Sequence, residues 1–253
     1  MHADFDLTGR VALVTGSTTG LGRAMAFALA AHGARVVLNY ANNVERATAC
    51  FDEFKAAGYE GILSRGSVID EAEVDRICSE AEAALGGIDI FVVNATPEQP
   101  QRPIEEYDWD FHQQMLDFFV KSPFLLTRRT LPHMRSQQWG RIINIGSEVF
   151  LRGTPNFSPY VAAKGAQNGW TRSMATELAP QGITVNMISP GWIPVERHSG
   201  AQPDQLENYR STVPLGRMGV PTDLSGAVVF LASEASSFLT GQNLHVNGGT
   251  TTH

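Results

Sequence analysis

The sequence alternates short apolar runs with longer segments of helical periodicity, and this alternation limits the possible folds more than any other feature. The apolar runs predict strands at Val11–Thr15, Arg35–Tyr40, Gly61–Arg65, Ile88–Asn94, Gly140–Ile145, Thr184–Ser189 and Asn243–Val246. The helical patterns between them lie at Leu21–His32, Val44–Ala57, Glu71–Leu85, Glu106–Met134, Pro159–Ala179 and Thr222–Ala232. Nearly continuous apolar strands are typical of a parallel sheet covered on both faces. We therefore expect an α/β fold, with a doubly wound parallel sheet of about seven strands in three α/β/α layers.

Charge and cysteine content narrow the classes of partner and compartment. The chain has 19 Lys and Arg against 26 Asp and Glu, and this net charge of −7 disfavours binding to nucleic acid or to an acidic membrane. The two cysteines, Cys50 and Cys78, cannot form a disulfide framework, and their spacing suggests no metal site. The sequence contains neither an export signal nor an apolar run long enough to span a bilayer. We expect a cytoplasmic protein without a metal.

The chain contains no linker, internal repeat or low-complexity segment. Residues 1–253 are therefore interpreted as a single domain that binds a dinucleotide and carries the catalytic residues. Its longest stretch without clear periodicity is Trp192–Gly219, which is rich in polar residues and proline. Because loops of this length in compact domains usually serve a function, we expect Trp192–Gly219 to contact the substrate.

A glycine-rich turn, Thr15–Gly22, joins the first predicted strand to the first predicted helix. Glycines at 16, 20 and 22 let the backbone turn tightly and approach a pyrophosphate, while the helix N-terminus offers free N–H groups and a positive dipole end. A purely structural turn uses glycine in the same way, so the motif alone leaves both interpretations open. Its place between a strand and a helix favours a Rossmann-type dinucleotide site.

The end of the second predicted strand bears on the choice between NAD(H) and NADP(H). In a dinucleotide fold, an acidic residue there binds the ribose 2′-hydroxyl and repels a 2′-phosphate. The segment Leu38–Asn43 contains no acid, and Arg23 and Arg46 are near in the sequence. The sequence therefore favours NADP(H) over NAD(H).

Three residues near the fifth predicted strand form a candidate catalytic group. Tyr160 and Lys164 are four residues apart and share one face of a predicted helix, and Ser147 follows the strand. A free phenol titrates near pH 10, and a neighbouring ammonium is expected to lower that pKa. Ser147 can hydrogen-bond a substrate oxygen whose charge changes during reaction. A tyrosine and lysine at this spacing are usually only a surface contact, so the interpretation depends on the combination.

In combination, these residues resemble the short-chain dehydrogenase/reductase superfamily, in its single-domain branch. The resemblance extends over nearly the whole chain and includes Thr15–Gly22, Asn94, Ala95, Ser147, Tyr160, Lys164, Ser189–Gly191, Pro214–Gly219, Thr240–Gln242 and Val246–Gly249. It implies that Ser147 orients the carbonyl, that Tyr160 is the acid/base, and that Lys164 binds the nicotinamide ribose and tunes Tyr160. The likeness is to 3-oxoacyl-[acyl-carrier-protein] reductases and to sugar or polyol dehydrogenases of that superfamily.

The resemblance also implies cofactor contacts and an assembly. The implied contacts to NADP(H) or NAD(H) are Gly16, Thr18, Thr19, Gly20, Leu21, Gly22, Tyr40, Asn42, Ser67, Val68, Asn94, Ala95, Tyr160, Lys164, Pro190, Gly191 and Ile193. The implied assembly is a homotetramer that uses the predicted helices Glu106–Met134 and Pro159–Ala179.

The chain departs from the family pattern at a position that bears on catalysis. Where the family has an asparagine whose carbonyl holds a proton-relay water, this chain has Phe119. Pro123 lies four residues later and has no N–H to donate to the Phe119 carbonyl. Our hypothesis is that Pro123 frees the same main-chain oxygen and preserves the water site. Thr96, Ser67 and Val195 are further departures, at a glycine, an acid and a threonine of the family.

Two functions follow from these observations. The first is an oxidoreductase that reduces a ketone to a secondary alcohol, with a pocket formed by Thr96–Pro103, Glu148–Pro159 and Trp192–Gly219. Phe150, Phe157 and Trp192 would give this pocket apolar walls, and its polar candidates are Glu148, Arg152, Glu196, Arg197 and His198. The alternative, supported by Phe119 and Thr96, is a catalytically weak or inactive nucleotide-binding protein with a regulatory role.

Overall fold

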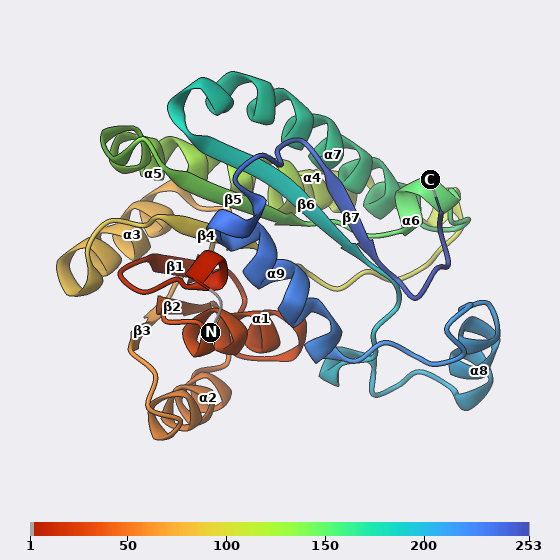
Figure 1. The fold of residues 1–253 in the computed structure, drawn as a ribbon. Coiled ribbons are helices and arrows are strands. Elements are labelled where there is room, and N and C mark those ends of the chain that lie inside the picture. The colour runs from red at the N-terminus through yellow and green to blue at the C-terminus, as the bar shows by residue number, and fades with distance from the viewer. Residues whose placement is uncertain (1–2, 253) are drawn as a thin grey trace.

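The computed structural model describes residues 3–252 and contains one seven-stranded sheet in the order β3-β2-β1-β4-β5-β6-β7 (Figure 1). The strands are β1 (Val11–Val14), β2 (Arg35–Tyr40), β3 (Gly61–Arg65), β4 (Ile90–Val93), β5 (Gly140–Ile145), β6 (Ile183–Pro190) and β7 (Asn243–Val246). Every neighbouring pair is parallel. The predicted fold class is confirmed, and each predicted strand forms within a few residues of its expected bounds.

Helices cover both faces of the sheet (Figure 1). They are α1 (Gly20–Ala31), α2 (Val44–Ala56), α3 (Glu71–Leu85), α4 (Trp109–Leu116), α5 (Ser122–Gln137), α6 (Val149–Arg152), α7 (Ser158–Leu178), α8 (Pro203–Ser211) and α9 (Ser225–Ala232). Side chains of β1 alternate between two cores, since Ala12 and Val14 pack with α1, α2 and α9, whereas Val11 and Leu13 pack with α3, α5 and α7. This double burial explains why the strands read as continuous apolar runs.

The predicted helix Glu106–Met134 is interrupted. The structure divides it into α4, a π-helical segment at Asp117–Lys121 and α5, and the Ser122 N–H bonds to the Asp117 carbonyl five residues back. Pro123 follows directly, and its missing N–H prevents the α-helical bond that would otherwise stabilise this turn. Single π-helical turns are frequent at functional sites.

The predicted loop Trp192–Gly219 contains a helix that the sequence did not reveal. No side chain of α8 is fully buried, and only Leu206 and Tyr209 are partly buried, so the helix has no continuous apolar stripe for periodicity to detect. The short helix α6, within the predicted loop Glu148–Pro159, escaped notice because a single turn has no measurable period. Helix α6 follows β5 and α8 follows β6, so both lie beyond the carboxyl ends of the strands. In such sheets ligands bind at this edge, near the point between β1 and β4 at which the strand order reverses.

Candidate active site

The glycine-rich turn between β1 and α1 holds the main chain very close to the turn after β4. Gly16 and Gly20 have φ values of +61° and +54°, a conformation that glycine adopts without strain. A Cβ on Gly16 would lie 3.0 Å from the Cα of Ala95, and one on Gly22 would clash with Asn94 and the Gly16 carbonyl. Packing against the turn after β4 therefore requires glycine at positions 16 and 22, and the predicted approach to a pyrophosphate stays a prediction.

Three polar side chains brace this turn. The buried Asn39 accepts a hydrogen bond from the Gly16 N–H at 3.2 Å, and Thr15 Oγ1 accepts from the N–H groups of Asn94 and Ala95 at 2.8 and 2.9 Å. Asn94 Nδ2 donates to the Thr15 carbonyl at 2.9 Å. The Asn94 side chain thus supports the turn, and its predicted contact with the cofactor stays a prediction. The bracing role of Asn39 was missed, because a polar residue ending a strand carries no distinctive pattern.

The turn fits a pyrophosphate. Thr19 caps α1 with extended backbone but makes no capping bond, and its buried Oγ1 faces the Glu196 carboxylate from the loop after β6. The first N–H groups of α1 and this hydroxyl are the donors that a phosphate would accept. The other predicted cofactor positions gather at the same edge of the sheet, at or beyond the ends of their strands: Tyr40, Asn42, Ser67, Val68, Asn94, Ala95, Pro190, Gly191 and Ile193.

The arginines near the end of β2 differ in their contacts. Arg65, opposite Tyr40 in the sheet, donates to the Ala41 carbonyl at 3.1 Å and makes no ion pair in the described chain. Arg23 forms an ion pair with Glu53, whereas Arg46 makes no ion pair in the described part of the chain. Only the backbone N–H of Arg46 is engaged, by the Asn43 cap of α2 at 2.9 Å. Ser67, in the position of the family's acid, has its N–H bonded to Glu73.

Ser147 and Tyr160 lie together at the carboxyl end of β5. Both are buried, and Ser147 also accepts a long hydrogen bond of 3.4 Å from the Val149 N–H. Burial raises the pKa of Tyr160, while the charge of Arg197 and a hydrogen bond with Ser147 act in the opposite direction. Desolvation dominates, and the opposing positive charge belongs to Arg197. The expected lowering by Lys164 beside a bound nicotinamide stays a prediction. The contribution of Arg197 was missed, since loop charges are usually solvated.

Lys164 is enclosed by three groups. Its Nζ donates to the Ile145 carbonyl at 2.5 Å and to Gln167 Oε1 at 3.0 Å, and it lies 3.6 Å from the centroid of the Phe119 ring. Burial lowers the pKa of Lys164 well below its usual range, and Arg197 lowers it further. Phe119 is itself buried, with its ring edge-to-face against Tyr160 at 5.4 Å. The residue that replaces the family asparagine is thus a direct neighbour of both catalytic candidates.

The π-helical segment bears on the Pro123 hypothesis. It includes Phe119, and it ends immediately before Ser122 and Pro123. The helix is therefore distorted at the expected place, although the predicted exposure of the Phe119 carbonyl to a water stays a prediction.

The polar residues of the predicted substrate loops have separate roles. The buried Glu148 accepts hydrogen bonds from Arg152, from the Tyr209 hydroxyl at 2.8 Å and from Asn247, so it joins α6, α8 and the segment after β7. Glu196 lies by the start of α1: burial raises its pKa, but Thr19 and the backbone N–H of Gly20 help to lower it overall. His198 accepts from the Val195 N–H at 3.1 Å.

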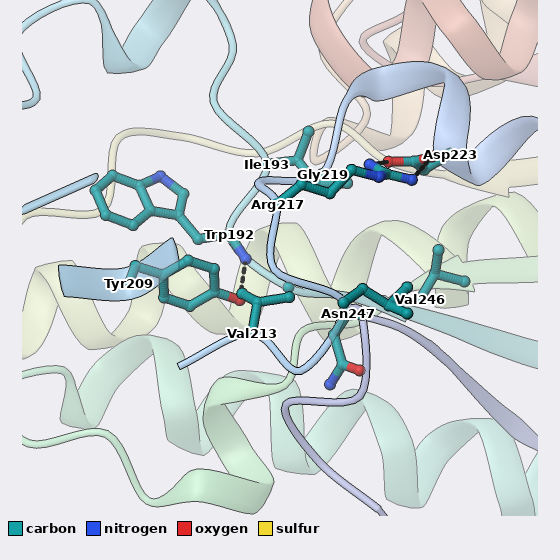
Figure 2. Close-up of a pocket in the computed structure, with 12 residues that line it drawn as sticks. Trp192, Ile193, Tyr209, Val213, Arg217, Gly219, Asp223, Val246 and Asn247 are labelled. Atoms are coloured by element: carbon teal, nitrogen blue, oxygen red, sulfur yellow. Dashed lines mark hydrogen bonds and ion pairs between the residues drawn. The ribbon is translucent and has the colours of Figure 1, made fainter. Parts of the chain in front are cut away.

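A cavity of about 190 Å³ lies between α8, the end of β6 and the segment after β7 (Figure 2). Its walls include Ile193, Val213 and Val246. On one side, the Tyr209 hydroxyl accepts a hydrogen bond from the Trp192 N–H at 2.7 Å, which is the dashed contact in Figure 2. Burial raises the pKa of Tyr209 to about 12, so this hydroxyl stays protonated and continues to donate to Glu148.

The described chain contains neither a cluster of metal ligands nor a membrane-spanning helix. Among residues 3–252, no group of three or more His, Cys, Asp or Glu side chains is arranged to hold a metal ion. No helix in that part of the chain is both long and apolar enough to cross a membrane.

Comparison with known proteins agrees with this geometry. A family model described as enoyl-(acyl carrier protein) reductase matches residues 16–251. A 3-oxoacyl-[acyl-carrier-protein] reductase from Staphylococcus aureus is 38% identical over 240 residues, covering 94% of this chain and 96% of the relative. Nodulation protein G from Azospirillum brasilense is 36% identical over 245 residues, covering 96% of this chain and 98% of that protein.

The fold is also similar to that of a solved dehydrogenase structure. A gluconate 5-dehydrogenase from Burkholderia cenocepacia, in complex with NADP and tartrate, is 34% identical, has a TM-score of 0.90 and covers 98% of this chain and 97% of its own. The fold and the glycine-rich turn are those of a dinucleotide-binding α/β protein. With these matches, the chain belongs to the short-chain dehydrogenase/reductase superfamily of oxidoreductases, as its motifs predicted.

Proposed function

We propose that this protein uses NADPH to reduce a ketone to a secondary alcohol. The observation that carries the proposal is the meeting of Ser147, Tyr160 and Lys164 at the carboxyl end of β5, on the edge of the sheet that also holds the glycine-rich turn. When bound, the nicotinamide supplies the hydride that reaches the carbonyl carbon. The side chains of the protein act on the substrate oxygen and on the proton that it receives.

The three side chains act on that oxygen in different ways. Ser147 donates a hydrogen bond to it and orients the carbonyl, and Tyr160 gives it a proton. Because burial raises the pKa of Tyr160, the phenol keeps its proton at neutral pH, which is the form needed for reduction. In this proposal, Lys164 brings a buried positive charge close to the developing negative charge and holds the nicotinamide ribose.

The preference for NADPH rests on two features. No carboxylate ends β2, and Arg46 is an unpaired cation beside the expected ribose position in the described chain. The presence of NADP in the gluconate 5-dehydrogenase complex supports the same choice.

The proposed substrate is a 3-oxoacyl or sugar-type ketone, in line with the names of the relatives. The buried Phe157 and the partly buried Phe150 and Trp192 supply apolar contacts beside the polar reaction centre. We place the protein in the cytoplasm as a homotetramer. Exposed Trp109 and Phe124, on α4 and α5, support an interface on those helices.

The test is the loss of reduced-nicotinamide absorbance with NADPH, then NADH, against a panel of ketones, oxoacyl thioesters and keto sugars. Turnover with at least one substrate is expected. Tyr160→Phe is expected to lower turnover by at least about a thousandfold, because the proton donor is lost, while cofactor affinity stays within about twofold. Tight cofactor binding without turnover on any substrate would instead favour the non-catalytic alternative, which the apolar Phe119 beside Lys164 supports.

A further inference from the structure

The side-chain amide of Gln167 is unusual because it is completely buried while one of its two polar atoms has no hydrogen-bond partner among residues 3–252. Gln167 lies one turn after Lys164 on α7 and is completely buried, as are Ala163 and Thr171 one turn before and after it on that helix. Its Oε1 accepts from Lys164 Nζ at 3.0 Å, but its Nε2 is buried with no hydrogen-bond partner among residues 3–252. An unpaired buried amide lowers stability, so packing alone would favour an apolar residue here.

The orientation of this amide follows from the ammonium beside it. An ammonium only donates hydrogen bonds, so the amide oxygen must face Lys164, and the nitrogen must point away from it. The unpaired Nε2 is therefore a consequence of serving Lys164. The Gln167 main chain is occupied separately, because its carbonyl accepts from the Thr171 hydroxyl at 2.8 Å.

The contacts of Lys164 come from three elements. Strand β5 supplies the Ile145 carbonyl, the π-helical segment supplies the face of Phe119, and α7 itself supplies Gln167. The ionisable groups near this ammonium are Tyr160, whose ring centroid is 5.6 Å away, and Arg197, which acts against its charge. No carboxylate of the described chain forms an ion pair with Lys164, so neutral acceptors must stabilise its charge.

We propose that Gln167 is a positioning residue, whose amide oxygen holds the Lys164 ammonium charged and fixed beside Tyr160. It compensates for Phe119, which offers a π face but no hydrogen-bond acceptor side chain at the other side of the ammonium. The inference rests on the function proposed above, in which Lys164 must be an ammonium during reduction.

The sequence offers an unusually direct test, because the chain has only three lysines, Lys55, Lys121 and Lys164. Labelling lysine with ¹³C at Cε gives three NMR signals that can be followed against pH in the protein without added ligand. Lys55 and Lys121 are exposed and serve as internal references. Substituting Lys164→Met identifies its signal.

Gln167→Met keeps an unbranched side chain of similar length but removes the acceptor. Lys164 is then expected to lose its proton at lower pH, and the alkaline limb of the turnover profile should move the same way, with turnover at neutral pH reduced about tenfold. Gln167→Glu places a carboxylate there and should move both curves to higher pH. The matched control is Thr171→Val, which removes a buried hydroxyl one turn later on α7 without touching Lys164.

Opposite shifts for the Met and Glu variants, with none for Thr171→Val, support positioning. An unchanged Lys164 titration in Gln167→Met, or equal shifts in all three variants, would overturn it. If the titrations shift as expected but the wild-type protein reduces no carbonyl in the panel, the proposed function fails while the contact between Gln167 and Lys164 stands.

Discussion

The dinucleotide end of the site is shaped by main chain and small buried side chains, whereas the reaction end is shaped by long side chains from several elements. At the first, Thr15, Asn39 and Asn94 bond to backbone groups of neighbouring strand ends. At the second, Lys164 depends on Phe119 and Gln167, which come from the π-helical segment and α7. The dinucleotide end therefore follows from the fold itself, whereas single substitutions can change the contacts of Lys164 at the reaction end.

The largest effect on cofactor binding is expected from filling the backbone contact at the dinucleotide end. In Gly22→Ala, the new Cβ would clash with the Asn94 amide and the Gly16 carbonyl, so the turn must shift. Overpacking of this kind costs about 1–3 kcal/mol, and NADPH affinity measured by fluorescence should fall by about tenfold to a hundredfold. Gly226→Ala on α9 is the control, because its Cβ meets nothing within 4 Å. Equal affinities for both variants would contradict a backbone-built site.

The same contrast explains what the sequence could predict. Strands, most helices and the glycine-rich turn follow from periodicity and turn chemistry, which act over short stretches. The charge of Arg197 near Tyr160 and the contact of Phe119 with Lys164 join residues 37 and 45 positions apart in the sequence. No local pattern encodes such contacts, and helix α8 was not predicted because it has no fully buried side chain and hence no apolar stripe.

A smaller effect separates the two cofactors at the dinucleotide end. Arg46→Ala removes a cation near the end of β2 that makes no ion pair in the described chain, so the Michaelis constant for NADPH should rise by about tenfold. The constant for NADH should hardly change, because NADH has no 2′-phosphate. Steady-state kinetics with both cofactors measure the ratio. Arg23→Ala is a suitable comparison, since Arg23 is paired with Glu53. A parallel loss for both cofactors would mean that Arg46 only supports the fold.

The smallest expected effect lies at the reaction end and concerns Arg197. Its side chain is solvent-accessible, yet its charge opposes the burial that raises the pKa of Tyr160 and adds to the burial that lowers the pKa of Lys164. Arg197→Met should therefore raise both pKa values. Since reduction needs a protonated phenol and a charged lysine, the alkaline limb of turnover should move to higher pH.

Solvent screening should keep this shift below about one pH unit. Rate–pH profiles for the wild-type and Arg197→Met proteins measure it, and raising the salt concentration should make the difference smaller. Arg210→Met removes a positive charge from the same stretch of chain, but that arginine is paired with Glu207, so its profile should match the wild type. A limb that moves to lower pH in Arg197→Met would show that Arg197 does not act on Tyr160 and Lys164 through its charge. The reaction end would then depend on its buried neighbours alone.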